Sequence, residues 1–211
     1  FPGLALPAFD ALAQQATVFT HVVPDGAFTE EVVPSLLTSW PVDAIRASSN
    51  GRQVLLRNPA TGKWRLFDQH QTVFQDALND GYSTAVAGWY NPYCRILPQV
   101  LDRCFWTLQL PYPGGIDAGQ SAAANAWDQL APHLDSLSAL LPFKHRNTSG
   151  LALDTRLHVA DYDDLYQAAD SMLNDPAADF LFLHMPIPHP QGIYDRRRGV
   201  LTTAPTSYID N

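Results

Sequence analysis

The chain has 211 residues, of which 46% are hydrophobic and 11% aromatic, and its formal charge at pH 7 is −8. This length suits one large domain, or at most two small ones, and is enough to bury a core that folds without metal or disulfide support. The excess of acidic residues argues against a protein that binds nucleic-acid phosphates. No apolar run approaches the roughly 18 residues of a membrane span. Composition therefore favours a folded globular domain without indicating its activity.

Helical and strand-like patterns alternate along the chain, which favours a layered α/β fold. In the first third, the spacing of apolar residues and the turn residues predict a helix over Leu6–Ala16, a strand over Thr17–Val23, a helix that begins at Thr29, and a β-hairpin over Gln53–Phe67 with its turn at Asn58–Gly62.

The same reasoning extends through the rest of the chain. It predicts a helix over Gln71–Asp80, a strand over Ser83–Tyr90, a helix from Ile96, a strand over Cys104–Leu110, a helical region over Asp117–Leu141, a helix over Val159–Leu173 capped by Asp161 or Asp163, and a strand over Asp179–Ile187. The last strand is a continuous apolar run, which is typical of a strand buried on both faces.

The chain has two cysteines, Cys94 and Cys104. In an extracytoplasmic protein their spacing suits a disulfide that closes a small loop. In a cytosolic protein they would be two buried thiols. A metal site is the weaker interpretation, because no second cysteine pair or nearby histidine completes a tetrahedral ligand set.

Three places in the sequence are candidates for chemistry. Thr29 precedes two glutamates at a predicted helix start, where it would either cap the helix or lie beside free N–H groups that hold an anion. His184 and His189 flank a proline-rich loop after the last predicted strand. They would either bind a metal or a substrate oxygen, or be one core and one solvent-exposed histidine. Arg196 opens a run of three arginines that would either attract an anionic substrate or be a solvated loop.

Four stretches, taken in order, resemble sulfatase-type proteins of the alkaline phosphatase superfamily. LPAFDALAQQATVFTHVV resembles the family segment "LPNLDRLAAEGVRFTNAY", and TEEVVPSLLTSW resembles the nucleophile segment that runs into a "SLLTG"-like helix. TVFQDALNDGYSTAVAGWY resembles "TLAELLKEAGYRTAAVGKW". FLFLHMPIPHP, with the closing SYIDN, is similar to the histidine loop of the family and the helix that follows it. The similarity runs from Leu6 to Asn211.

The resemblance places Thr29 in the position of the nucleophile. Sulfatases proper carry Cys or Ser there, followed by x-P-x-R, and convert it to formylglycine, whereas residues 30–33 read Glu-Glu-Val-Val here. This departure argues against a formylglycine sulfatase. An unmodified threonine resembles the phosphoethanolamine-transferase branch, as does the spacing of His184 and His189. The lysine of the family's "GKW" is also missing, because Trp89 follows Gly88.

The fold that the resemblance implies is a three-layer α/β/α sandwich of the alkaline phosphatase type. Residues 1–211 would form part of one catalytic domain, incomplete at both ends. The first strand with its metal-binding aspartate would lie upstream, and the Asp-His metal pair downstream. The complete domain would use a divalent metal, zinc first and calcium or manganese as alternatives. We expect these residues alone to bind no metal tightly and to be inactive.

The activity implied is metal-dependent hydrolysis or transfer at phosphate or sulfate esters through a covalent threonine intermediate. Thr29 would bind the metal and attack, His189 would donate to the phosphoryl or leaving oxygen, and His184 and Arg196 would contact the substrate. The expected substrate is a small anionic ester or lipid head group, with no nucleic-acid partner. The parent protein would be periplasmic and membrane-anchored through segments outside this chain, which fits a Cys94–Cys104 disulfide. The alternative is a non-catalytic, sulfatase-like binding or scaffold domain.

Overall fold

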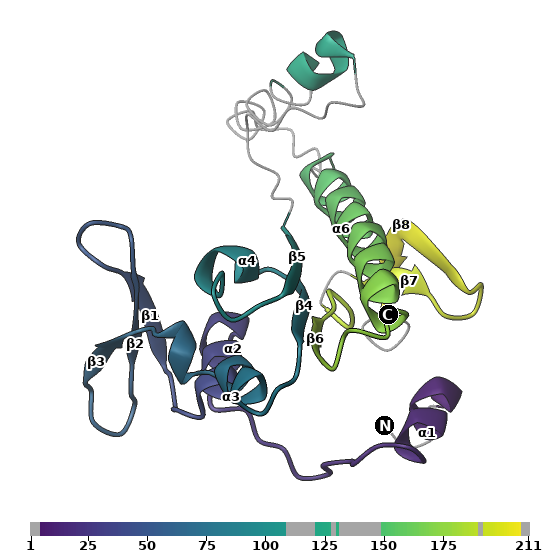
Figure 1. Ribbon diagram of the computed structural model, residues 1–211. Helices are drawn as coiled ribbons and strands as arrows, with labels where there is room; N and C mark the ends of the chain where they lie inside the picture. The colour runs from purple at the N-terminus through teal and green to yellow at the C-terminus, as the bar shows by residue number, and fades with distance from the viewer. Residues whose placement is uncertain (1–4, 109–120, 128–129, 131–148, 190–191, 208–211) are drawn as a thin grey trace. The chain divides into compact units, whose positions relative to one another are not determined.

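The computed structural model describes residues 5–108, 121–127, 130, 149–189 and 192–207 (Figure 1). Phe1–Phe67 and Asp68–Asn211 form two compact units, and each is described by itself. The first unit contains α1 (Pro7–Ala13), α2 (Thr29–Thr38), β1 (Ala44–Ala47), β2 (Val54–Arg57) and β3 (Trp64–Leu66). The second contains η1 (Gln69–Gln71), α3 (Val73–Asn79), β4 (Thr84–Trp89), α4 (Tyr93–Ile96), β5 (Arg103–Thr107), α6 (Ser149–Leu173), β6 (Phe180–His184), β7 (Gly192–Asp195) and β8 (Val200–Thr206).

The segment before α2 differs from its predicted structure. Helix α1 forms where it was expected and buries no residue. The strand predicted over Thr17–Val23 is wrong, because these residues are irregular and pair with no described strand. Their apolar side chains, including Phe19 and Val23, are exposed. A β-branched pattern specifies a strand only where a neighbour completes its hydrogen-bond ladder and covers one face.

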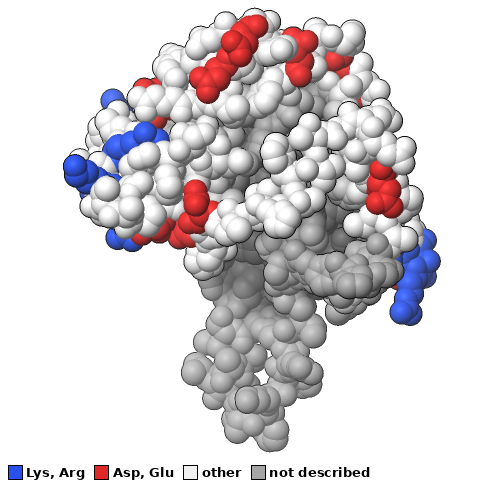
Figure 2. Space-filling model, turned by 90° about the horizontal axis from the view of Figure 1, so that it is seen from below, with Lys and Arg blue, Asp and Glu red and all other residues white. Residues whose placement is uncertain are grey.

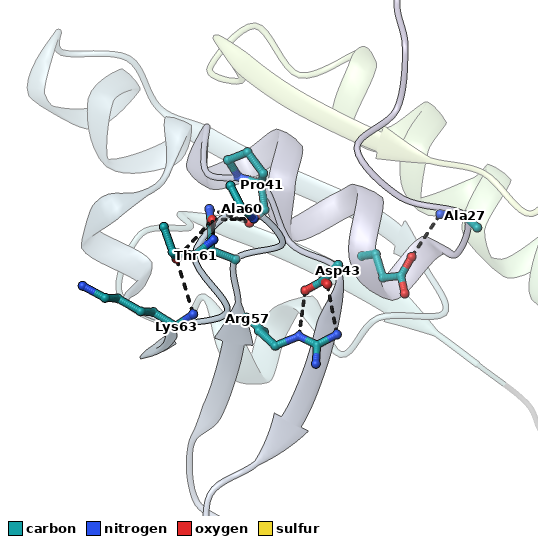
Figure 3. A network of polar contacts seen from close by, with 9 residues as sticks. Ala27, Pro41, Asp43, Arg57, Ala60, Thr61 and Lys63 are labelled. Carbon is teal, nitrogen blue, oxygen red and sulfur yellow. Dashed lines mark hydrogen bonds and ion pairs between the residues drawn. The ribbon is translucent and has the colours of Figure 1, made fainter.

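The first unit is built on an antiparallel meander with the strand order β1-β2-β3. The predicted hairpin is confirmed as β2 and β3, and β1 was not predicted. The hairpin turn is closed by Asn58, whose side-chain oxygen accepts from the N–H groups of Ala60 and Thr61 (Figure 3). Asp43 accepts two hydrogen bonds from Arg57 at 3.0 Å each, which joins the start of β1 to the end of β2. This bidentate ion pair holds the pKa of the Asp43 carboxyl below its ordinary value.

The second unit contains a parallel sheet with the strand order β5-β4-β6. Its central strand, β4, is buried from Thr84 to Gly88. Ala85 and Ala87 pack against α6 in a cluster with Leu165, Ala169 and Met172. Alternation along the strands turns the other face toward Phe74 of α3, which contacts Phe180 and Phe182 of β6 edge to face. Helices therefore cover both faces of this sheet (Figure 1), and the mixed α/β class expected from the sequence is confirmed.

Several predicted bounds in the second unit need correction. Helix α6 begins at Ser149, so neither Asp161 nor Asp163 caps it. The helix expected over Ile96–Leu101 is wrong, because the helical turn α4 lies before it and ends at Ile96. The long final strand stops at His184, and the cis peptide bond Ile187–Pro188 follows in an irregular loop. Most of the helical region predicted over Asp117–Leu141 lies outside the described residues. None of the helices described has the length and apolar character needed to cross a membrane.

Candidate functional site

The carboxyl ends of the three parallel strands bring several polar and aromatic residues to one edge of the sheet. Trp89 is the last residue of β4 and pairs in register with Thr107, the last residue of β5. His184 ends β6 and lies opposite Gly88. Because the strands are parallel, their carboxyl ends meet at the same edge, which is where open α/β sheets bind ligands.

Three histidines surround the indole ring of Trp89. The His158 ring, from α6, stacks on it with 5.1 Å between ring centroids and an interplanar angle of 11°. His189 meets the indole edge to face at 5.0 Å, and His184 does so at 6.3 Å. His158 and His189 are also 5.5 Å apart. We call Trp89, His158, Asp161, His184 and His189 the histidine cluster.

Asp161 fixes the centre of the histidine cluster. It is only 1% exposed. One carboxylate oxygen accepts from Trp89 Nε1 at 3.1 Å, and the other accepts from Thr107 Oγ1 at 2.6 Å. A buried carboxylate is tolerated where hydrogen bonds satisfy its oxygens. Asp161 therefore ties α6 to the ends of β4 and β5, instead of capping a helix as the sequence suggested.

His184 is held by a tyrosine that the sequence did not single out. The Tyr93 hydroxyl lies 2.8 Å from His184 Nδ1. Burial raises the pKa of Tyr93, so the phenol keeps its proton. Burial also lowers the pKa of His184, and a hydrogen bond with the Trp89 backbone offsets this only in part. The phenol therefore donates to a neutral imidazole, whose hydrogen is on Nε2.

Gly88 leaves the space that Tyr93 occupies. A Cβ atom at Gly88 would overlap the Tyr93 ring. Tyr93 belongs to α4, next to Cys94, and Cys94 forms a disulfide with Cys104 of β5, with an S–S distance of 2.05 Å. The predicted pairing of the two cysteines is thus confirmed. It attaches α4 to the sheet beside the tyrosine that contacts His184.

His189 follows the proline-rich loop after β6. The loop is attached to α6, because His158 Nε2 lies 2.9 Å from the Pro186 carbonyl oxygen and so donates to it. His158 is buried, and the ring of His189 lies against both His158 and Trp89. Of the two predicted histidines, His189 therefore lies within the cluster through ring contacts, and His184 through a hydrogen bond to Tyr93.

Thr29 belongs to the first unit and begins α2. The residue at the N-cap is Phe28, so the interpretation of Thr29 as the cap is wrong. Its hydroxyl has no hydrogen-bond partner among the residues that the structure describes. Glu31 turns back along the chain, and its carboxylate accepts from the Ala27 N–H at 3.0 Å (Figure 3). The Glu31 carboxylate therefore satisfies a backbone donor ahead of the helix, as glutamates do in capping boxes.

Arg196 lies in the turn that joins β7 to β8. Asp195 closes this turn by accepting from the backbone N–H groups of Arg197 and Arg198. All three arginine side chains are exposed. The run is therefore part of a hairpin turn.

Sequence reasoning missed His158, Asp161 and Tyr93. His158 and Asp161 share one face of α6 with the buried Leu165, Ala169 and Met172, at helical spacings of three and four. The sequence feature that could have identified them is the presence of a histidine and an aspartate on a helix face that is otherwise apolar. Tyr93 gave none, because its importance comes from a contact with a residue 91 positions away.

The histidine cluster does not fit a divalent metal as it is arranged. Both Asp161 oxygens, His184 Nδ1 and His158 Nε2 make hydrogen bonds within the protein. Across the described residues, no group of three or more His, Cys, Asp and Glu side chains converges to hold a metal ion.

No protein-family model, curated protein or solved structure matches the chain.

Proposed function

We propose that this chain carries part of the active site of a hydrolase or transferase that acts on phosphate or sulfate esters. The observation that supports this most directly is the gathering of His158, His184 and His189 around Trp89 at the carboxyl edge of a parallel sheet. The helices on both faces of that sheet support the α/β/α sandwich that the sulfatase resemblance implies. The Cys94–Cys104 disulfide supports an extracytoplasmic, periplasmic location.

Each residue has a defined role in this proposal. Thr29 Oγ1 attacks phosphorus or sulfur, a new O–P or O–S bond forms, and the bond to the leaving oxygen breaks. As the sulfatase resemblance implies, the leaving oxygen takes a proton from His189, and the threonine proton passes to solvent. The free N–H groups in the first turn of α2 stabilise the negative charge on the transferred group.

The other cluster residues position His189. Asp161 holds the indole of Trp89, on which His158 stacks and against which the edge of His189 rests. His158 also holds the loop through Pro186. Arg196 supplies positive charge for an anionic ester or lipid head group. The resemblance implies a divalent metal in the complete domain, and its ligands would have to come from outside the histidine cluster.

A second candidate function is a non-catalytic binding or scaffold domain of the same fold. The hydrogen bonds that occupy the Asp161 and His184 donor atoms favour it, because a satisfied polar cluster stabilises a fold without taking part in chemistry.

The test is turnover of p-nitrophenyl phosphate and p-nitrophenyl sulfate by the full-length protein. We expect Thr29→Ala to lower kcat by at least about a thousandfold, because it removes the nucleophile. Thr29→Ser should keep part of the activity, and mass spectrometry should find an adduct on Thr29. The matched control is Thr38→Ala, at the other end of α2, where the hydroxyl only donates to the Pro34 carbonyl.

Two results would reject the proposal. Full activity of the Thr29→Ala variant would exclude Thr29 as the nucleophile. A wild-type protein that binds phosphate or sulfate esters, but neither turns them over nor forms the adduct, would establish the scaffold function instead.

A further inference from the structure

The meander of the first unit has a positive net charge, whereas the rest of the chain has a negative net charge. Residues 41–67 contain five of the 13 Lys and Arg residues of the chain, but only one of its 21 Asp and Glu residues. Their net charge is +4, whereas the whole chain carries −8, which leaves −12 for the remaining residues. In Figure 2, blue side chains gather over this part of the molecule.

One face of the meander combines cationic and apolar side chains. The strand register places Ala44, Arg57 and Trp64 in one row across the sheet. The next row on the same face contains Arg46, Leu55 and Leu66. The guanidinium of Arg46 lies 4.1 Å from the centre of the Trp64 ring, and that of Arg57 lies 5.8 Å from it. Two cations are thus held against one indole.

This face is held in place by contacts within the meander. Arg57 makes its bidentate ion pair with Asp43 (Figure 3). Arg46 lies over the indole and has no carboxylate partner among the described residues. Arg52 and Lys63 are exposed at the turns that precede β2 and β3, so cations also lie at both ends of the strands. A guanidinium already restrained by an aromatic ring loses little entropy when it binds phosphate.

Apolar side chains are also exposed on this face, and they favour a lipid bilayer over a soluble polyanion as the partner. Leu66 is 48% exposed, in the row that contains Arg46. A soluble polyanion is bound by charge and gains nothing from an exposed leucine. An anionic bilayer attracts the arginines and lysine to its phosphates and also buries the leucine. Trp64 is a side chain typical of the membrane–water interface.

We propose that the exposed face of the meander, formed by Arg46, Arg57, Trp64 and Leu66 and flanked by Arg52 and Lys63 at its turns, docks on an anionic lipid bilayer. The rest of the chain is net negative and is repelled by the same bilayer, so the meander is the part of the chain that electrostatics draws to the lipid. This inference does not depend on the proposed catalytic function.

The experiment measures cosedimentation of the purified chain with phosphatidylcholine vesicles, with or without 30 mol% phosphatidylglycerol. We expect binding to the anionic vesicles only, weakened by added salt. The double variant Arg52→Glu/Lys63→Glu should lose at least about tenfold in affinity, since each basic residue near an anionic surface contributes about fivefold. Leu66→Ser should weaken binding mainly at high salt, where charge is screened.

The matched control is Arg197→Glu/Arg198→Glu, which makes the same change in charge at the exposed turn between β7 and β8. It should bind like the wild type, and circular dichroism should show that both double variants are folded. Equal losses in the two double variants would overturn the proposal, because they would reflect net charge only. Binding to heparin without binding to anionic vesicles would also overturn it and would identify a soluble polyanion as the partner.

Discussion

Tyr93 shows how a single buried residue can set the chemical state of another. The phenol is buried, keeps its proton, and donates to His184 Nδ1. The imidazole is held neutral by burial, so it has one acceptor nitrogen, directed at Tyr93, and one nitrogen that carries hydrogen. His184 is therefore held in one orientation by Tyr93, and in the function we propose His189 is the proton donor.

Replacing Tyr93 by Phe tests this assignment. The variant keeps the ring over Gly88 but removes the donor to His184 Nδ1, while the hydrogen bond with the Trp89 backbone remains. The pKa of His184 should rise, because the lost hydrogen bond stabilised the neutral ring. Nitrogen-15 NMR of the histidine rings, recorded as a function of pH, measures this pKa. Tyr82→Phe, at an exposed position before β4, is the control. An unchanged or lower pKa of His184 in Tyr93→Phe would contradict the assignment.

At the scale of elements, α6 is attached to the sheet through one polar residue as well as through its apolar stripe. Leu165, Ala169 and Met172 pack on β4, and Asp161 satisfies donors from the ends of β4 and β5. The carboxylate also fixes the angle of the Trp89 ring, against which two histidines rest. Stability and site geometry thus depend on the same side chain.

Substituting Asp161 by Ala should therefore be costly. It would leave Trp89 Nε1 and Thr107 Oγ1 without this acceptor in a largely buried place, at about 1–3 kcal/mol for each lost partner. Urea denaturation followed by circular dichroism measures the free energy of unfolding. Asp163→Ala, two residues away on an exposed position of the same helix, should cost less than about 0.5 kcal/mol. Equal costs for the two variants would show that Asp161 does not join α6 to the sheet.

At the scale of the whole molecule, the buried histidine makes stability depend on pH. The pKa of His184 in the folded state is lower than in the unfolded state. At a pH between these two pKa values, the unfolded chain binds a proton at His184 that the folded chain does not. The stability that neutral His184 contributes is therefore complete above about pH 6.5 and is lost as the pH falls through the folded-state pKa. His70 has a raised pKa because Gln75 and Gln99 accept hydrogen bonds from it, so it acts in the opposite direction. His70 is exposed, and its effect is screened by solvent.

The melting temperature should therefore fall as the pH is lowered from 7.5 to 5.5. In His184→Gln the fall should be smaller, because the group whose folded and unfolded pKa values differ is gone. Differential scanning calorimetry of both proteins across this range isolates the contribution of His184. A steeper fall of the melting temperature in the variant would mean that folding raises the pKa of His184, which would exclude a buried neutral imidazole.

Much of the local structure was predictable because neighbouring residues encode it. The hairpin turn at Asn58–Gly62, the strand that follows Ser83 and the start of the helix at Thr29 follow from turn chemistry and apolar pattern, whereas the spacing of Cys94 and Cys104 allowed a disulfide without deciding it. The predicted strand over Thr17–Val23 failed because a strand depends on a neighbour, which no local pattern provides.

The sequence by itself determined the mixed α/β class and the presence of His184 and His189 after the last apolar run. Its prediction that this last strand is buried on both faces is wrong, because β6 lies at the edge of the described sheet and β4 is the buried central strand. Only the tertiary structure decided what surrounds them. His158, Asp161 and Tyr93 reach Trp89 and His184 across separations of 69, 72 and 91 residues. Such contacts are fixed by strand register and helix packing, so the hydrogen-bonded state of each histidine depends on the assembled sheet edge.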